Sequence, residues 1–197
     1  MKFLKLKFNN FEQGRGFTLI ETLVAVSIFT VSILALMAVL SDSVATNAYA
    51  KKKIVATYLG QEGLELVRNL RDTSVLYQST LTRGWDDFKQ SISPCDSTLV
   101  DACYIDDTNI DFLNTAQAVR DLNISSCSEG DCPALLYNDI TGKYGYKDGN
   151  ETDFIRNISV TNVTENEVKV TSKVYWQQGS GTYFVSFSEN LFDWTRQ

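Results

Sequence analysis

The residues best suited to chemistry lie near the start of the chain, where a glycine is soon followed by a lone carboxylate. Gly16 precedes Phe17, and Glu21 is the single charged residue between Phe17 and Ser41. If the chain is cut after Gly16, the new α-ammonium group of Phe17 lies about one helical turn from the Glu21 carboxylate. A buried cation and a buried carboxylate each need an opposite charge. The spacing predicts that Glu21 pairs with Phe17, across two copies if chains stack.

A plainer interpretation of Glu21 stays open, in which it sits at a membrane interface and favours the positive end of the helix dipole. Either way, the element that positions it is the apolar block from Gly16 to Leu40, which has no charge between Thr22 and Ser41. Crossing about 30 Å of hydrocarbon takes about 20 helical residues. A buried core helix would show a polar stripe, whereas this block is apolar on all sides. The block therefore predicts a membrane-spanning helix.

The string G-FTLIE, from Gly16 to Glu21, follows a short basic leader and resembles the type IV prepilin signature. This resemblance implies cleavage after Gly16 and N-methylation of Phe17 by a prepilin peptidase and methyltransferase. It also implies helices packed in a filament core together with other pilin or pseudopilin subunits. The strings YLGQEGLELVRNLRD and GWDDF further resemble a subset of minor-pilin-like proteins, which favours a minor pilin or pseudopilin.

These observations divide the chain into a leader (1–16), a membrane or filament-core helix (17–41), an amphipathic helix extension (42–72) and an extracytoplasmic head (73–197). The leader carries three net positive charges, which favours a cytoplasmic location for it and an inner-membrane anchor before assembly. A lysine triplet, Lys51–Lys53, lies soon after the span on the other side and weakens this argument. Orientation therefore depends mainly on the cleavage motif.

Two other interpretations of the N-terminus remain. A basic start and an apolar run also describe a secretory signal, and Ala48-Tyr49-Ala50 has the form of a cleavage site. The apolar run is longer than the usual 7–15 residues, and Glu21 interrupts it. The second alternative is a solitary single-pass membrane protein with an adhesive or ligand-binding head. It predicts no cut at Gly16 and no association with pili.

Composition narrows the function classes. The 197 residues carry a net charge of −6 and no histidine, and without the leader the charge is −9. An acidic body is a poor general partner for nucleic-acid phosphates, and histidine is the commonest catalytic base and metal ligand. With no nucleotide-binding loop and no nucleophile motif either, the sequence favours a structural protein over an enzyme and predicts no cofactor.

Four cysteines lie beyond the apolar block, which predicts disulfides in an oxidising compartment. They are Cys95, Cys103, Cys127 and Cys132. Three pairings are possible, and the local ones, Cys95–Cys103 and Cys127–Cys132, are favoured. Their spacing does not match a zinc site. Two groups of acidic residues, one at 106–111 and one at 148–153, offer oxygens for calcium. Neither has the ladder of a calcium loop, so an acidic surface and a plain turn are favoured and no metal is expected.

The rest of the chain predicts an α+β fold, in which the long N-terminal helix packs on a C-terminal antiparallel sheet. A helical stripe in the extension includes Val44, Ala48, Val55, Leu59, Leu66 and Leu70. Gly60 and Gly63 indicate either close approach of a neighbour or simple local softness. Strict alternation from Val168 to Trp176 predicts a half-buried strand, with extended segments before and after it. Residues 73–140 are interpreted as the variable connection of the pilin fold and 141–197 as its sheet.

Overall fold

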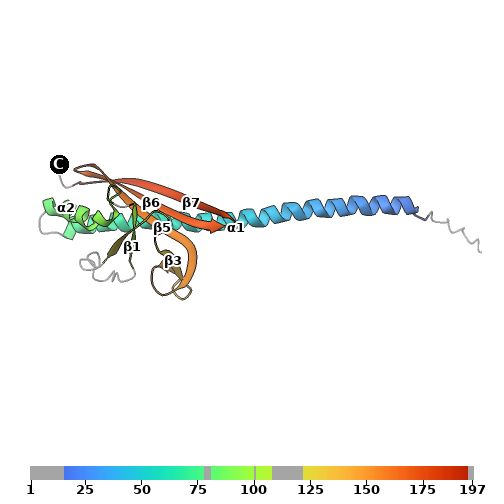
Figure 1. The fold of residues 1–197 in the computed structure, drawn as a ribbon, viewed down its shortest axis with the longest axis horizontal. Helices are drawn as coiled ribbons and strands as arrows, with labels where there is room; N and C mark the ends of the chain where they lie inside the picture. Colours follow the sequence, from blue (N-terminus) through green and yellow to red (C-terminus); the bar gives the residue numbers. More distant parts are fainter. Residues whose placement is uncertain (1–15, 78–80, 100, 108–121, 195–197) are drawn as a thin grey trace, which may run out of the picture. The chain divides into compact units, whose positions relative to one another are not determined.

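A computed structural model describes residues 16–77, 81–99, 101–107 and 122–194 of the chain. The helices are α1 (Leu19–Tyr77), α2 (Leu81–Ser91) and the short 3-10 helix η1 (Ser93–Cys95). Seven strands follow, and their bounds are β1 (Ala102–Asp106), β2 (Asn123–Cys127), β3 (Ala134–Asn138), β4 (Lys143–Gly145), β5 (Asn150–Thr164), β6 (Glu167–Gln178) and β7 (Gly181–Phe192). The chain divides into two compact units, Met1–Asn47 and Ala48–Gln197 (Figure 1).

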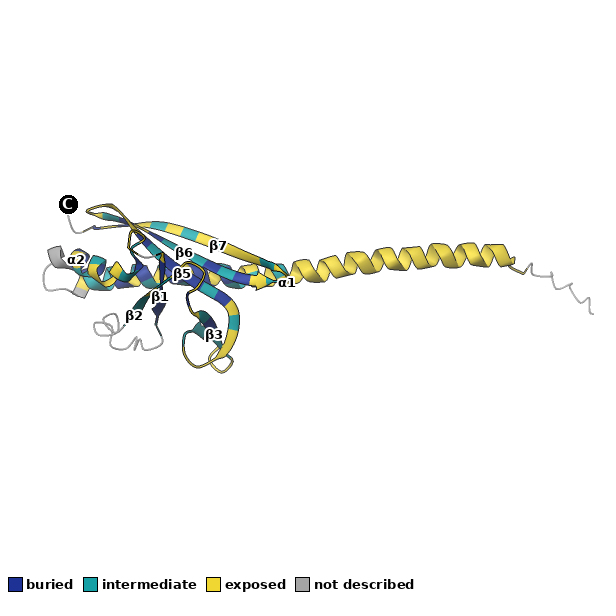
Figure 2. Cartoon of the chain, in the orientation of Figure 1, coloured by how far each residue is buried: buried dark blue, intermediate teal, exposed yellow. Residues whose placement is uncertain are grey.

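The first unit contains the N-terminal part of α1, whose side chains are exposed all round. Figure 2 shows this stretch as exposed along its whole described length. Large apolar residues from Phe17 to Leu40 are open to the surroundings. A helix that is apolar on every face is stable only when lipid or other helices cover it, and α1 is long and apolar enough to cross a membrane.

The second unit is built on a seven-stranded sheet, as the α+β prediction requires. Strands β5, β6 and β7 form an antiparallel meander, with Val174 opposite Arg156 on one side and Val185 on the other. The far edge of β5 pairs with β3 along one stretch and with β1 along another, and these carry β4 and β2 respectively. The predicted fold class is confirmed: a long N-terminal helix packs on a C-terminal antiparallel sheet.

The region between the helix and the meander is more regular than the sequence indicated. Residues 73–140 contain α2, η1 and three strands, β1 to β3, rather than only a variable connection. Helix α1 also runs to Tyr77, beyond the expected end at residue 72. The strands β1 and β2 are only five residues long, and such short segments carry too few residues for a clear period-two pattern. The acidic residue Asp111 lies outside the described residues.

The buried face of α1 agrees with the predicted stripe only in part. Leu59 and Leu70 are almost fully buried as predicted, whereas Val44 and Ala48 are exposed. The core also uses Ala56, Val67 and Val75, which the predicted stripe did not include. The difference has a steric cause: the sheet approaches the helix at its glycines, so the buried stripe passes through them. Periodicity alone therefore found Leu59 and Leu70 but did not find the buried residues Val67 and Val75.

Two apolar clusters fill the space between α1 and the sheet. The larger one contains Trp85 and Phe88 from α2 and Ile92, which follows that helix. The smaller cluster centres on Trp176, Phe154 and Leu135. Trp85 also donates a hydrogen bond from Nε1 to the Glu165 carbonyl at 2.8 Å, which fixes α2 against the β5–β6 turn.

Candidate processing and assembly site

The residues predicted to be cut and modified lie immediately before α1. Gly16, Phe17 and Thr18 precede the helix, and Phe17 and Gly16 are exposed. A side chain added at Gly16 would meet no other atom within 4 Å. The glycine and the following peptide are therefore accessible. The leader that the sequence predicts before Gly16 lies outside the described residues.

Thr18 is the N-cap of the helix, a role that was not predicted from the sequence. Its Oγ1 accepts a hydrogen bond from the Glu21 N–H at 3.3 Å, and its carbonyl accepts one from the Thr22 N–H at 3.2 Å. This is the N-cap position, where a threonine oxygen satisfies one of the free N–H groups of the first turn. The signal was present as T-x-x-E from Thr18 to Glu21, the capping-box pattern.

Glu21 lies in the first turn of α1. The positive end of the helix dipole favours a carboxylate there, and within the described residues Glu21 makes no ion pair. The ion pair expected with Phe17 needs a free amino group, which exists only after cleavage. It therefore stays a prediction, and the carboxylate is in place to receive such a partner.

Hydroxyl groups of the apolar helix donate hydrogen bonds to backbone carbonyls of the same helix. Thr22 Oγ1 donates to the Leu19 carbonyl at 2.9 Å, Ser27 Oγ to Val24 at 2.8 Å and Ser32 Oγ to Ile28 at 2.8 Å. In hydrocarbon, a polar group without a partner costs several kcal/mol. Because these donors are already bonded, these hydroxyl groups can enter lipid or a helical bundle without an outside partner, unlike the Glu21 carboxylate.

The second half of α1 carries two glycines in close contact with the sheet. A Cβ at Gly60 would lie 2.8 Å from Cδ2 of Phe187, and one at Gly63 would lie 2.5 Å from Oγ of Ser172. Both distances are too short for a real side chain. Of the two interpretations of these glycines, close approach of the head is the one that the geometry supports.

A buried arginine lies beside these glycines. Arg156 is 1% exposed, its Nη1 lies 3.2 Å from Oε2 of Glu62, and it donates to the Leu59 carbonyl at 3.4 Å. Burial raises the pKa of Glu62, while Arg156 opposes that rise. Burial likewise raises the pKa of Tyr146, whose ring lies 5.9 Å from the guanidinium carbon. The cluster ties the helix to β5 through one ion pair and one backbone contact.

Two disulfides brace the head, and they are the local pairs that the sequence favours. Cys95–Cys103 joins η1 to β1, with Cα atoms 4.8 Å apart, and Cys127–Cys132 closes the loop after β2, with Cα atoms 5.2 Å apart. The second loop is held on the sheet by Glu129, whose Oε1 lies 2.7 Å from Lys173 Nζ. That contact and a hydrogen bond from Tyr175 lower the pKa of Glu129.

The acidic group at 148–153 lies in the bend before β5 and in the first residues of that strand. Asn138 Nδ2 donates to the Asp148 carbonyl at 2.9 Å, and Asp148 has a left-handed φ of 52°. Asp106 is buried at the end of β1, 3.6 Å from Lys147 Nζ. Over the described ranges, no group of three or more His, Cys, Asp or Glu residues could hold a metal ion.

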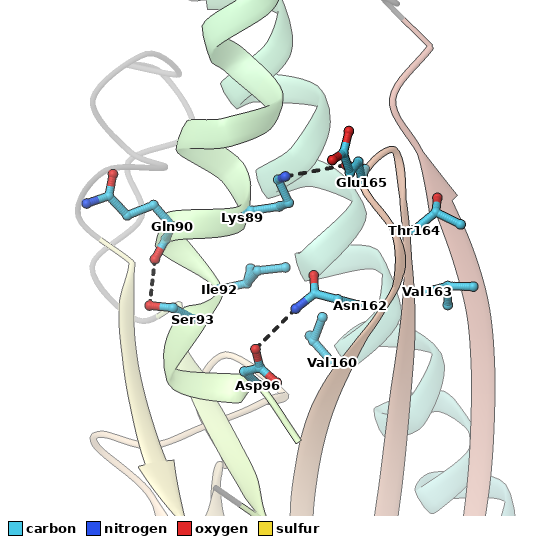
Figure 3. Close-up of a pocket in the computed structure, with 10 residues that line it drawn as sticks. All are labelled: Lys89, Gln90, Ile92, Ser93, Asp96, Val160, Asn162, Val163, Thr164 and Glu165. Carbon is cyan, nitrogen blue, oxygen red and sulfur yellow. Dashed lines mark hydrogen bonds between the residues drawn. The ribbon is translucent and has the colours of Figure 1, made fainter. Parts of the chain in front are cut away.

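A hollow of about 560 Å³ lies between α2, η1 and the β5–β6 turn (Figure 3). Its polar groups bond to one another: Asn162 Nδ2 donates to Asp96 at 3.1 Å, and Lys89 Nζ donates to the Glu165 carbonyl at 3.4 Å. The other Asp96 oxygen accepts from Thr98. These contacts join α2 to the sheet, so the hollow is a structural seam rather than a site with ligating groups.

Comparison with known proteins gives one match. The family model described as the prokaryotic N-terminal methylation motif matches residues 14–37. This range includes Gly16, Phe17, Thr18 and Glu21 and most of the exposed apolar helix. The comparisons found no matching curated protein and no matching solved structure.

Proposed function

We propose that this chain, a type IV pilin-like protein by the prepilin signature at residues 14–37, is a minor pilin or pseudopilin in a type IV pilus-like filament. The observation that carries the proposal is the contrast within α1. Its first part exposes apolar side chains on every face, and its second part is buried against the head. Such a helix needs lipid before assembly and neighbouring helices afterwards.

The proposed mechanism begins with processing at the exposed Gly16–Phe17 peptide. A prepilin peptidase and methyltransferase cuts after Gly16 and methylates the new amino group of Phe17. Residues 1–16 are then the leader, 17–41 the membrane or filament-core helix, 42–72 its amphipathic extension and 73–197 the head. The chain waits in the inner membrane as a single-pass protein with its head outside the cytoplasm.

Assembly then moves the apolar helix from lipid into a bundle of subunit helices. Glu21 pairs with the Phe17 amino group of a neighbouring subunit, which neutralises both charges where water is absent. The self-bonded hydroxyls of Thr22, Ser27 and Ser32 need no new partners during this transfer. The protein's own role is structural, because the chemistry is done on the chain by its processing enzyme.

The direct test is the N-terminal residue and the intact mass of the protein from its native cell envelope. We expect a chain that begins with N-methylated Phe17. An unprocessed Met1 in cells with an active peptidase would favour the solitary membrane protein, and a start at Lys51 would make the apolar block a discarded signal. A variant with a bulky residue in place of Gly16 is the control, since it should keep the leader while the head folds normally.

A further inference from the structure

The lysine triplet Lys51–Lys53 has no role in the proposed function. It follows the uncharged run after a gap in which Asp42 is the only charged residue. Positive charge is ordinarily concentrated on the cytoplasmic side of a membrane span, so a triplet on the opposite side calls for a local cause. It is also unusual in a chain whose net charge is −6.

The three lysines differ in their surroundings. Lys52 Nζ lies 2.6 Å from Oδ2 of Asp153 and donates to the Gln177 carbonyl at 2.7 Å, so it joins the helix to β5 and to the end of β6. Lys51 and Lys53 are exposed. Across the described residues, neither has a carboxylate partner, although Lys53 lies 5.8 Å from the centre of the Tyr49 ring. Two of the three charges therefore remain for an outside anion.

An aromatic group lies beside Lys53 in the second unit. Tyr49 contacts Trp176 and Tyr183, with ring centres 6.0 and 5.2 Å apart, and Trp176 stacks on Tyr183 at 5.9 Å. Tyr183 is 41% exposed. The β6–β7 turn beside it, from Gln177 to Thr182, contains no charged residue. Lysines with exposed tyrosine and a neutral polar turn form the composition typical of a membrane–water interface.

Chain connectivity brings this surface within range of a bilayer. Lys51 follows Asp42 by nine positions, and even a fully extended chain of that length spans at most about 30 Å. The headgroup layer extends about 5–7 Å beyond the hydrocarbon on each side. Surface charges act over a Debye length of about 8–10 Å in physiological salt. If the hydrocarbon ends near Asp42, this short connection therefore allows the two free ammonium groups to approach lipid phosphates.

We propose that Lys51 and Lys53 bind the phosphates of anionic phospholipids, so that this end of the head rests on the extracytoplasmic membrane surface before assembly. The inference depends on the proposed function for the location of the head. Lys52 keeps the β6–β7 turn against the helix, and Tyr183 presents its ring to the headgroups. The occupant is lipid, because the surface combines free cations with an interfacial aromatic and follows the membrane-spanning segment closely in the sequence.

The test uses the full chain in lipid nanodiscs of pure phosphatidylcholine, or with about a third phosphatidylglycerol. A fluorophore on Ser180→Cys, in the β6–β7 turn, reports quenching by a lipid that carries a nitroxide on its headgroup. We expect strong quenching only with phosphatidylglycerol, and its loss at high salt. Lys51→Gln with Lys53→Gln should lower the docked-to-undocked ratio by about tenfold.

The matched control is Lys89→Gln with Lys169→Gln, which removes the same charge near the β5–β6 turn, at the opposite end of β6. It should quench like the parent. Equal quenching in both lipids would overturn the proposal, and so would an equal loss of quenching in the two double variants. An effect of the lysines that is seen only in assembled subunits would also overturn it. Incorporation into nanodiscs is measured separately by size exclusion. Failure there would count against the membrane anchor of the proposed function and not against the lysine contacts.

Discussion

The two parts of α1 belong to one continuous run of helical residues, but their side chains are packed in opposite ways. Up to Asn47 the helix has no glycine after Gly16, exposes apolar side chains on all faces and bonds its hydroxyls to its own backbone. From Ala48 onward it carries Gly60 and Gly63, buries one stripe and binds the sheet through an ion pair.

This difference teaches that each part is built for its own surroundings. The first part makes no specific contact with a particular neighbour, which in the proposed assembly allows subunit helices to replace lipid around it. The second part packs on one partner, the sheet of the same chain. Its contacts at Gly60 and Gly63 leave no room for a side chain. Changes in the first part should therefore affect assembly, and changes in the second should affect folding.

The largest effect is expected from Glu21→Ala. The variant should still insert in the membrane, because the substitution removes a charge from the apolar run. Its head should fold, because Glu21 lies outside the second unit. Filament incorporation should fall by at least tenfold, since the Phe17 ammonium of a neighbour would lack its carboxylate in an apolar core. Quantitative immunoblots of sheared filaments and membranes measure this. Asp42→Ala, which removes a carboxylate at the other end of the apolar run, should assemble normally. Normal incorporation of Glu21→Ala would refute the pairing.

Gly63→Leu should disrupt the second part of α1 without affecting membrane insertion. The new side chain would overlap Ser172 and Arg156, and we expect the free energy of unfolding to fall by about 3 kcal/mol despite the higher helix propensity of leucine. Denaturant unfolding of the detergent-solubilised chain, followed by the fluorescence of buried Trp85 and Trp176, reports the loss. Gln61→Leu on the exposed face is the control and should change stability by less than about 0.5 kcal/mol. A wild-type midpoint for Gly63→Leu would contradict the close approach.

The Glu62–Arg156 pair should respond asymmetrically to removal of either partner. Glu62→Ala leaves a fully buried guanidinium without its carboxylate and should cost about 2 kcal/mol, reduced from the range for wholly buried pairs because the Glu62 side chain is 41% exposed. Arg156→Met fills similar volume and lets Glu62 hydrate, so it should cost less than about 1 kcal/mol. The same unfolding assay compares them, and equal or reversed losses would show that the arginine is not the dominant buried charge.

The smallest effect is a pH dependence with opposite signs for two carboxylates. The pKa of Glu62 is raised in the folded state, so the native chain holds an extra proton and stability should fall as pH rises from about 4.5 through that raised pKa. The pKa of Glu129 is lowered, so its contribution is present above its unfolded pKa and is lost as pH falls through the lower folded pKa.

Unfolding free energies measured across this range for Glu62→Gln and Glu129→Gln should separate the two contributions. The first variant should flatten the profile above about pH 4.5, and the second should flatten it below that value. Both groups are partly exposed, so the slopes should be shallow. A profile unchanged by Glu62→Gln would show that burial does not perturb this carboxyl.

The sequence predicts the first part of α1 far better than the head. Glycine, phenylalanine and glutamate at fixed spacing, followed by a long uncharged run, are a local pattern that needs no tertiary contact to interpret. The meander can also be predicted in part, because apolar and polar residues alternate strictly from Val168 to Trp176. The T-x-x-E cap at Thr18 was equally local and was nevertheless missed.

What sequence reasoning could not supply depends on contacts between distant residues. The buried stripe of α1 is set by where β6 and β7 approach Gly60 and Gly63, which periodicity cannot reveal. Arg156, inside a strand, gave no sign of being buried until Glu62 and Leu59 were found beside it. Strands β1 and β2 could not be recognised in the sequence, because five residues are too few for a clear period-two pattern. The ion pair of Glu21 with Phe17 remains a prediction.

The short span of both disulfides has a consequence for the order in which the head is made. Their cysteines are separated by only eight and five positions, so little chain entropy opposes closure. In the proposed topology, each bond can form as soon as its own segment has crossed the membrane, before β5, β6 and β7 have been delivered. Oxidation therefore does not have to wait for long-range folding, and two local staples are in place when the last strands arrive to complete the sheet.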